Sequence, residues 1–177
     1  MSLPPGSETH VAIGSAEPPR LATPLDGSRS LTAARLLGLE VRIIEHGHVT
    51  SVEEAAESAG VQPCDVVKTL VVRRGPDDYV LVLVPGDRSL AWPKLRSLLG
   101  VNRLSLPDAD EAKAATGYER GTITPLGVDL PVIADSSIRG RQITLGSGVR
   151  NVALGLSADD FIAAASTRLA IQVADVT

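Results

Sequence analysis

The order of hydrophobic and polar residues predicts many short strands with helices between them. An apolar run rich in β-branched residues at 66–72 predicts a strand, and residues 79–84 predict its partner across a hairpin turn. Shorter apolar runs predict further strands at 39–44, 101–104, 132–134, 141–145, 151–154 and 169–173. Because helices and strands do not alternate strictly, we expect an α/β or α+β fold with a mixed, strongly curved sheet.

Capping signals predict where the helices begin and end. Ser51 and Glu54 form a capping-box pattern, and Gly60 is placed to end the helix that follows. Pro93 suits the first turns of a later helix, which we expect to end before Gly100. Serine or aspartate also stands where other helices should start, at Ser28 or Ser30, Ser89, Asp108 and Ser157.

The N-terminal segment differs in composition from the rest of the chain. Residues 1–29 hold five prolines and few apolar residues, which predicts a flexible leader, while residues 30–177 are expected to form one folded domain. The single cysteine, Cys64, excludes an internal disulfide and suits a reducing compartment. Without a signal peptide or a long apolar run, we expect a soluble cytoplasmic protein and no membrane partner.

The net charge of −4 argues against an extended nucleic-acid-binding surface, which is normally basic. It leaves room for a small local basic patch. Three groups of basic residues occur along the chain, at residues 73–74, 94–96 and 139–141.

A loop rich in glycine, threonine and proline at 116–127 is the first candidate for function. Gly121 and Gly127 permit positive φ or a close approach of the backbone, and Pro125 stiffens the turn. Such a loop could bind a small polar group with its main chain, or could simply connect two elements.

Lys68 is the second candidate, because it lies within the apolar strand at 66–72. Alternation puts Lys68 on one face with Leu70 and Val72, and Thr69 on the other. A lysine there either reaches solvent at a sheet edge or points its ammonium into a pocket, where it can bind an anion. Asp135 could pair with Lys68 or cap its own turn.

Other reactive residues give weaker signals. His46 and His48 stand at a strand end without a nearby cluster of metal ligands, so we expect no metal site. Cys64 with His46 as a base would be a minimal arrangement for a thiol-dependent hydrolase, but the free structural cysteine is the favoured interpretation. The chain contains no Gly-x-Ser-x-Gly elbow and no Walker A loop.

Residues 67–71, the loop at 116–127, the run 131–135 and the turn 146–148 together closely resemble the YbaK/EbsC family. These bacterial aminoacyl-tRNA deacylases are related to the editing domain inserted in prolyl-tRNA synthetase. The resemblance runs from about Leu31 to the C-terminus, so the domain at 30–177 is expected to be YbaK-like.

The resemblance implies a curved, barrel-like mixed sheet surrounded by helices. It also implies hydrolysis of the ester between a wrong amino acid and the 3′ adenosine of aminoacyl-tRNA, without a metal or cofactor. The catalytic residues that it implies are Lys68, beside the terminal adenosine, with Gly121 and Thr122 in the loop. The substrate-binding residues that it implies are His46, Thr50, Thr69, Tyr118, Ile123, Thr124, Pro125, Asp135, Gly146, Ser147 and Gly148.

Two departures from the family pattern concern the pocket wall. Gly146, Ser147 and Gly148 replace the Ser-Gly-Gly of many members, and residues 151–153 lack an acidic residue that several carry. The choice between cysteinyl- and alanyl-tRNA(Pro) therefore stays open, as do a partnership with prolyl-tRNA synthetase and the oligomeric state. The alternative class is a catalytically weak module that binds a nucleotide or tRNA and acts with a synthetase.

Overall fold

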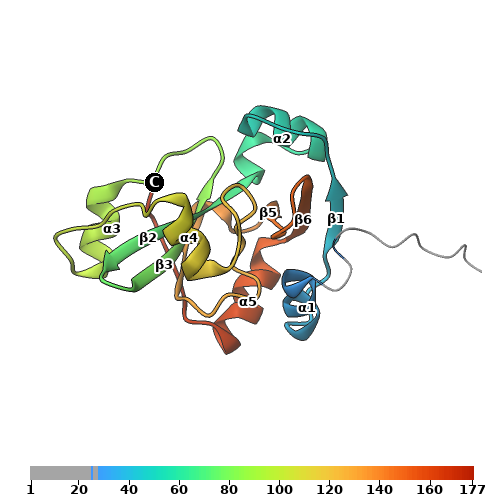
Figure 1. Cartoon of the computed structure of the whole chain (residues 1–177). Coiled ribbons are helices and arrows are strands. Elements are labelled where there is room, and N and C mark those ends of the chain that lie inside the picture. Colours follow the sequence, from blue (N-terminus) through green and yellow to red (C-terminus); the bar gives the residue numbers. More distant parts are fainter. Residues whose placement is uncertain (1–24, 26–27) are drawn as a thin grey trace, which may run out of the picture.

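The computed structural model describes Leu25 and residues 28–177, which form two β-sheets and five α-helices (Figure 1). Most of the predicted flexible leader, residues 1–24 and 26–27, lies outside the described residues. The first sheet is antiparallel, with the strand order β1 (Arg42–Glu45), β6 (Val152–Ser157), β5 (Gln142–Gly146). The second has four strands in the order β2 (Val67–Gly75), β3 (Asp78–Pro85), β4 (Val132–Asp135), β7 (Ile171–Ala174).

The second sheet is mixed, as the sequence predicts. β2 and β3 form an antiparallel hairpin, and β4 and β7 add to it in parallel. The barrel-like closure is not confirmed: in the described part of the chain the strands of the two sheets pair only through a single parallel bridge between Val66 and Thr144, and no barrel closes. Beyond that bridge β2 is an edge strand, apart from an isolated bridge near its end between Arg73 and Ser105.

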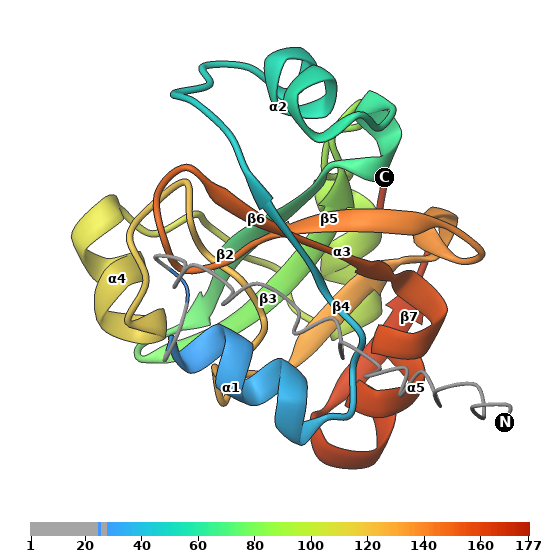
Figure 2. The same ribbon diagram turned by 90° about the vertical axis from the view of Figure 1, so that its right-hand side faces the viewer.

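The helices lie outside the sheets, with α2 at the opposite end of the molecule from α1 (Figure 2). The N-cap predictions at Ser28, Ser51, Asp108 and Ser157 are confirmed, because each side chain accepts a hydrogen bond from a backbone N–H in the first turn. The helices are α1 (Arg29–Leu36), α2 (Val52–Ala59), α3 (Trp92–Leu99), α4 (Ala109–Thr116) and α5 (Ala158–Arg168).

Two local predictions are wrong. The helix expected to start at Ser89 begins after Ala91, whose N–H donates to the carbonyl of Val176 at 2.8 Å. This contact between distant segments holds the backbone extended and so overrides the local cap. The strand expected at 101–104 is absent, and only Ser105 forms a bridge, with Arg73.

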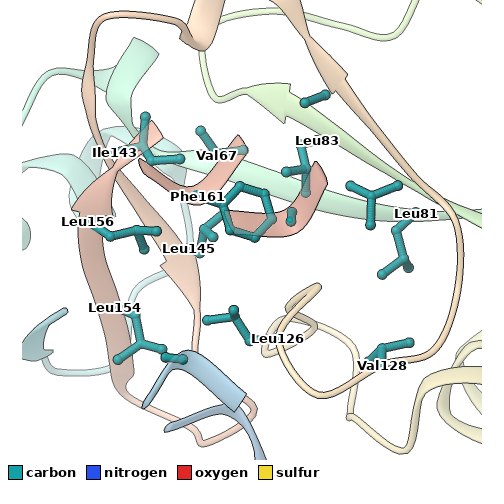
Figure 3. Packing of buried hydrophobic residues seen from close by; sticks show 14 of the residues in the cluster. Val67, Leu81, Leu83, Leu126, Val128, Ile143, Leu145, Leu154, Leu156 and Phe161 are labelled. Carbon is teal, nitrogen blue, oxygen red and sulfur yellow. The ribbon is translucent and has the colours of Figure 1, made fainter. Parts of the chain in front are cut away.

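The hydrophobic core lies on both faces of the second sheet. Alternate residues of β2 divide between two clusters, with Val67 and Val71 facing the larger one and Val72 facing the smaller. Phe161 of α5 is fully buried in the middle of the larger cluster, which also contains side chains of the first sheet (Figure 3). The core therefore fills the space between the two sheets.

The packed region begins before residue 30. Leu25 has no exposed surface and belongs to the larger core cluster, and the Ser28 N–H donates to the Leu25 carbonyl at 2.9 Å. Within the described residues, no helix is long and apolar enough to cross a membrane.

Candidate functional site

A cavity of about 350 Å³ opens where the two sheets separate, next to the Val66–Thr144 bridge. Strands β2, β5 and β6, helix α2 and the loop at 116–127 all contribute to its lining. The cavity brings together six of the residues that the family resemblance implies: His46, Lys68, Thr69, Gly121, Ile123 and Gly146.

The edge of β2 offers main-chain groups to this cavity. Arg73 and Ser105 exchange two backbone hydrogen bonds, of 2.8 and 3.2 Å, so the peptide groups of Arg73 face the outer edge. Backbone groups alternate along a strand, and therefore Thr69 and Val71 direct their N–H and C=O groups to the same edge. Both residues line the cavity, and the Thr69 hydroxyl is buried without a hydrogen-bond partner among the described residues.

Lys68 lines the cavity but turns its ammonium toward the loop after β3. Its Nζ donates to the carbonyls of Gly86 at 3.2 Å and Arg88 at 2.6 Å. Burial lowers the pKa of the Lys68 ammonium below its ordinary value, and the charge of Asp87 opposes this shift. Since an ammonium has three donors, one remains for a ligand.

The loop at 116–127 packs directly against the turn between β5 and β6. The Gly148 N–H donates to the Thr122 carbonyl at 2.8 Å. A side chain at Gly146 would place its Cβ only 2.6 Å from the Ile123 carbonyl oxygen, so glycine is required there for the loop to approach. Gly121 has a φ of 89° and lines the cavity, with open space where a Cβ would project.

Several implied site residues support this loop and do not line the cavity. The hydroxyls of Thr122 and Tyr118 donate to backbone carbonyls of the loop itself, Glu119 and Leu126, both at 2.8 Å. Ser147 is fully buried and donates to the Val152 carbonyl at 2.7 Å. The other residues of this kind are Thr124, Pro125 and Gly148, all within or against the loop.

Thr50 lies outside the cavity lining and is bound to Glu54. Its backbone N–H and its hydroxyl both donate to the Glu54 carboxylate, at 2.7 and 3.0 Å, completing the cap of α2. These hydrogen bonds lower the pKa of Glu54. Thr50 thus helps to fix α2, whose Ala55 and Ala59 do line the cavity.

Asp135 also lies outside the cavity lining and binds the C-terminal segment. Its carboxylate accepts hydrogen bonds from the N–H and hydroxyl of Ser137, the N–H of Val176 and the hydroxyl of Thr177. Among the described residues it makes no ion pair with Lys68. Burial raises the pKa of Asp135, but these hydrogen bonds outweigh burial and leave the pKa below its ordinary value.

The sequence did not indicate several residues of the lining. Arg120 is exposed at the cavity, and its place beside Gly121 was the only available signal. Leu106 is 47% exposed and contributes an apolar side chain to the lining. Val49, Ala153 and Thr144 come from segments that no sequence pattern brought together.

Cys64 does not line the cavity. The guanidinium of Arg141 donates to its sulfur at 2.5 Å and to Asp65 at 2.8 Å. Residues 28–177 and Leu25 contain no group of three or more side chains placed to hold a metal ion.

Comparison with known proteins shows to which family the chain belongs. The model of the aminoacyl-tRNA editing domain family matches residues 46–164, and the chain belongs to this family. The matched region includes all the implied site residues, with His46 at its first position.

Individual relatives connect the chain to prolyl-tRNA synthetases. It is 38% identical over 92 residues to a proline–tRNA ligase of Thermotoga maritima, a match that covers 52% of this chain and 16% of that ligase. A crystal structure of a proposed trans-editing enzyme for prolyl-tRNA synthetase has a TM-score of 0.76 and 25% identity, covering 88% of this chain and 98% of that one. A hypothetical protein has a TM-score of 0.74 and 28% identity, covering 84% and 98%.

Proposed function

We propose that this protein hydrolyses the ester that joins a wrong amino acid to the 3′ adenosine of a tRNA. Membership of the editing-domain family and the similarity to a proposed trans-editing enzyme support this activity. The observation that carries the proposal is the cavity, which brings Lys68, Gly121 and Gly146 together from three separate segments.

We propose cysteinyl- or alanyl-tRNA(Pro) as the substrate. The similarity to proline–tRNA ligases supports tRNA(Pro). Small apolar residues such as Ala55, Ala59 and Ala153 line the cavity of about 350 Å³. A cavity of this size and lining suits a short aminoacyl side chain at the end of the tRNA.

The chemistry requires positioning more than a strong nucleophile, because an aminoacyl ester is already activated. A water oxygen bonds to the ester carbon, the bond to the ribose oxygen breaks, and the proton passes to that ribose oxygen. The N–H groups of Gly121 and Ile123 donate no hydrogen bond within the described residues, and both residues line the cavity. They are our candidates for stabilising the oxyanion that develops at the ester carbonyl.

The remaining residues have supporting roles in this proposal. The Lys68 ammonium donates its third hydrogen bond to the adenosine end of the substrate. The buried Thr69 hydroxyl accepts or donates a hydrogen bond once the substrate is bound. Thr122 acts as a positioning residue, since its carbonyl holds the Gly148 N–H and its hydroxyl folds back onto the loop.

The test is a deacylation panel in which the purified protein receives tRNA(Pro) charged with alanine, cysteine, serine or proline. We expect rapid hydrolysis of the alanyl or cysteinyl ester and little hydrolysis of the prolyl ester. Cys64→Ser serves as a control and should keep full activity, because Cys64 does not line the cavity. Rates equal to spontaneous hydrolysis for all four esters would contradict the proposal.

A catalytically weak binding module is the second candidate. The observation that favours it is that the Lys68 ammonium is already bound by two carbonyls. Such a module would protect the ester from spontaneous hydrolysis in the same panel. Repeating the panel with added prolyl-tRNA synthetase tests the proposed partnership, which predicts faster hydrolysis of the wrong ester.

A further inference from the structure

A second groove, with four arginines in its lining, lies beyond the candidate site along β2. It has a volume of about 750 Å³. Arg73 and Arg74 come from the end of the β2–β3 hairpin, Arg96 from the last turn of α3, and Arg103 from the segment that follows α3. Four cations from three segments therefore face one hollow in a chain whose net charge is −4.

The charges in this groove are only partly neutralised. Arg73 pairs with Glu111 at 3.1 Å and Arg74 with Asp78 at 2.7 Å. Arg96 and Arg103 make no ion pair within the described residues, and Arg103 is exposed. Two positive charges therefore remain available to an anionic partner.

Two residues of the other basic groups are held by the protein itself, whereas Arg139 is exposed and makes no ion pair among the described residues. Lys94 donates to Asp175 at 2.8 Å and to the carbonyl of Thr177 at 2.5 Å. Arg141 is bound to Asp65 at 2.8 Å. The structure therefore brings Arg96, from the group at 94–96, to residues 73–74 and adds Arg103.

The groove lies next to the candidate cavity along β2 and along the segment after α3. Val71, Leu106 and Pro107 line the cavity, whereas Arg73 and Ser105 line the groove. The bridge between Arg73 and Ser105 forms the boundary. Two residues of strand span about 7 Å, so an extended polymer whose end occupies the cavity would pass over this bridge into the groove.

We propose that this groove binds the phosphodiester backbone of the nucleotides that precede the 3′-terminal adenosine of the substrate tRNA. This inference rests on the proposed function for its occupant. Guanidinium groups suit phosphate because they donate in pairs and keep their charge at all relevant pH values. The groove supplies a local cationic contact on a chain of acidic net charge, and it makes binding depend on salt concentration.

The test compares Arg96→Gln/Arg103→Gln with the matched control Arg35→Gln/Arg168→Gln, which removes two exposed arginines from α1 and α5. We expect the groove variant to raise KM for alanyl- or cysteinyl-tRNA(Pro) at least about tenfold, with kcat unchanged. The slope of affinity against salt concentration should fall by about one for each arginine. Hydrolysis of 3′-O-alanyl- or 3′-O-cysteinyl-adenosine, which lacks the preceding phosphates, should match the wild type.

Binding of uncharged tRNA(Pro), followed by fluorescence anisotropy, separates this inference from the proposed function. A weaker affinity and a smaller salt slope for the groove variant support the groove even if no ester is hydrolysed. An affinity and salt slope equal to those of the control variant would overturn it. An equal loss of rate on the aminoacyl-adenosine esters would also overturn it, because the arginines would then act at the reacting end.

Discussion

The Arg29 guanidinium stacks on the ring of Tyr118, with its central carbon 4.2 Å from the ring centroid. Its Nε donates to the Tyr118 hydroxyl at 3.2 Å and its Nη2 to the Thr116 carbonyl at 2.5 Å. The Tyr118 hydroxyl in turn donates to the Leu126 carbonyl at 2.8 Å. One residue of α1 thereby holds both ends of the loop that lines the cavity.

Replacing Arg29 should therefore affect the loop more than the fold. We expect Arg29→Ala to lower the free energy of unfolding by about 1 kcal/mol, since Arg29 is exposed although it contacts a buried ring. The value of kcat should fall severalfold as the loop loses its fixed ends, and Arg29→Lys should recover only part of it, because lysine lacks the planar fork. Melting temperature and single-turnover deacylation on the same preparations check this, and an unchanged kcat would limit Arg29 to a stabilising role.

Gly121 offers a cleaner test of the loop. Gly121→Ala should cost about 1 kcal/mol of stability, because alanine is strained at a φ of 89°. The substitution adds a methyl group to a residue that lines the cavity, so we expect turnover to fall, or the preferred amino acid to change, by more than the stability loss explains. Gly140→Ala is the matched control, with a φ of 70°, open space at Cβ and no place in the cavity lining. Equal deacylation by the two variants across the charged-tRNA panel would refute the role of the loop.

Lys68 should be required for rate but not for folding. We expect Lys68→Ala to reduce deacylation at least about tenfold, since a lost charge-assisted contact is worth roughly 1.5–3 kcal/mol. Lys68→Arg should also be impaired, because a planar guanidinium cannot reproduce the contacts of Nζ with Gly86 and Arg88. Single-turnover rates and melting temperatures check this, and a wild-type rate in Lys68→Ala would remove Lys68 from the site.

Asp135 should make stability depend on pH in the acid range. Its pKa in the folded state lies below the ordinary value of 3.8, so its contribution is complete above 3.8 and is lost as the pH falls through the folded pKa. Asp135→Asn should lower the free energy of unfolding at neutral pH and flatten this acid dependence. Denaturant titrations at several pH values measure both effects, and parallel pH profiles for the two proteins would contradict the prediction.

The N-terminal boundary can be located by two changes. Deleting residues 2–22, which are poor in core-forming side chains, should leave the melting temperature and deacylation nearly unchanged. Leu25→Ala should cost about 2–5 kcal/mol, because this side chain is fully buried in the larger core cluster. A loss of several degrees on deleting residues 2–22 would show that the predicted leader contributes to packing.

The sequence predicted best those features that depend on neighbouring residues. The caps at Ser51 and Asp108 and the alternation along β2 follow from local hydrogen bonding and side-chain periodicity, and all three are confirmed. The failure at Ser89 has the opposite cause, since the carbonyl of Val176, far along the chain, fixes the start of α3.

The residues of the candidate site were predicted only in part, because contacts between distant segments also decide which residues line the cavity. Lys68 and Gly121 meet at one cavity, as the family resemblance implies. Small polar residues such as Ser147 can form hydrogen bonds either with a ligand or with the protein backbone, and sequence alone does not distinguish these uses. Arg120 and Leu106 line the cavity where the two sheets separate, an arrangement of distant segments that no local pattern encodes.

The single bridge between Val66 and Thr144 has a consequence for engineering. Since this is the one strand bridge between the sheets among the described residues, we expect the angle between them, and with it the width of the cavity, to depend on the side chains packed behind it, Phe161 and Ile143 among them (Figure 3). Substrate size preference can then be altered by core residues that never touch the aminoacyl group. A library that varies the volume of these core side chains would offer a route to new substrate selectivity while keeping every lining residue intact.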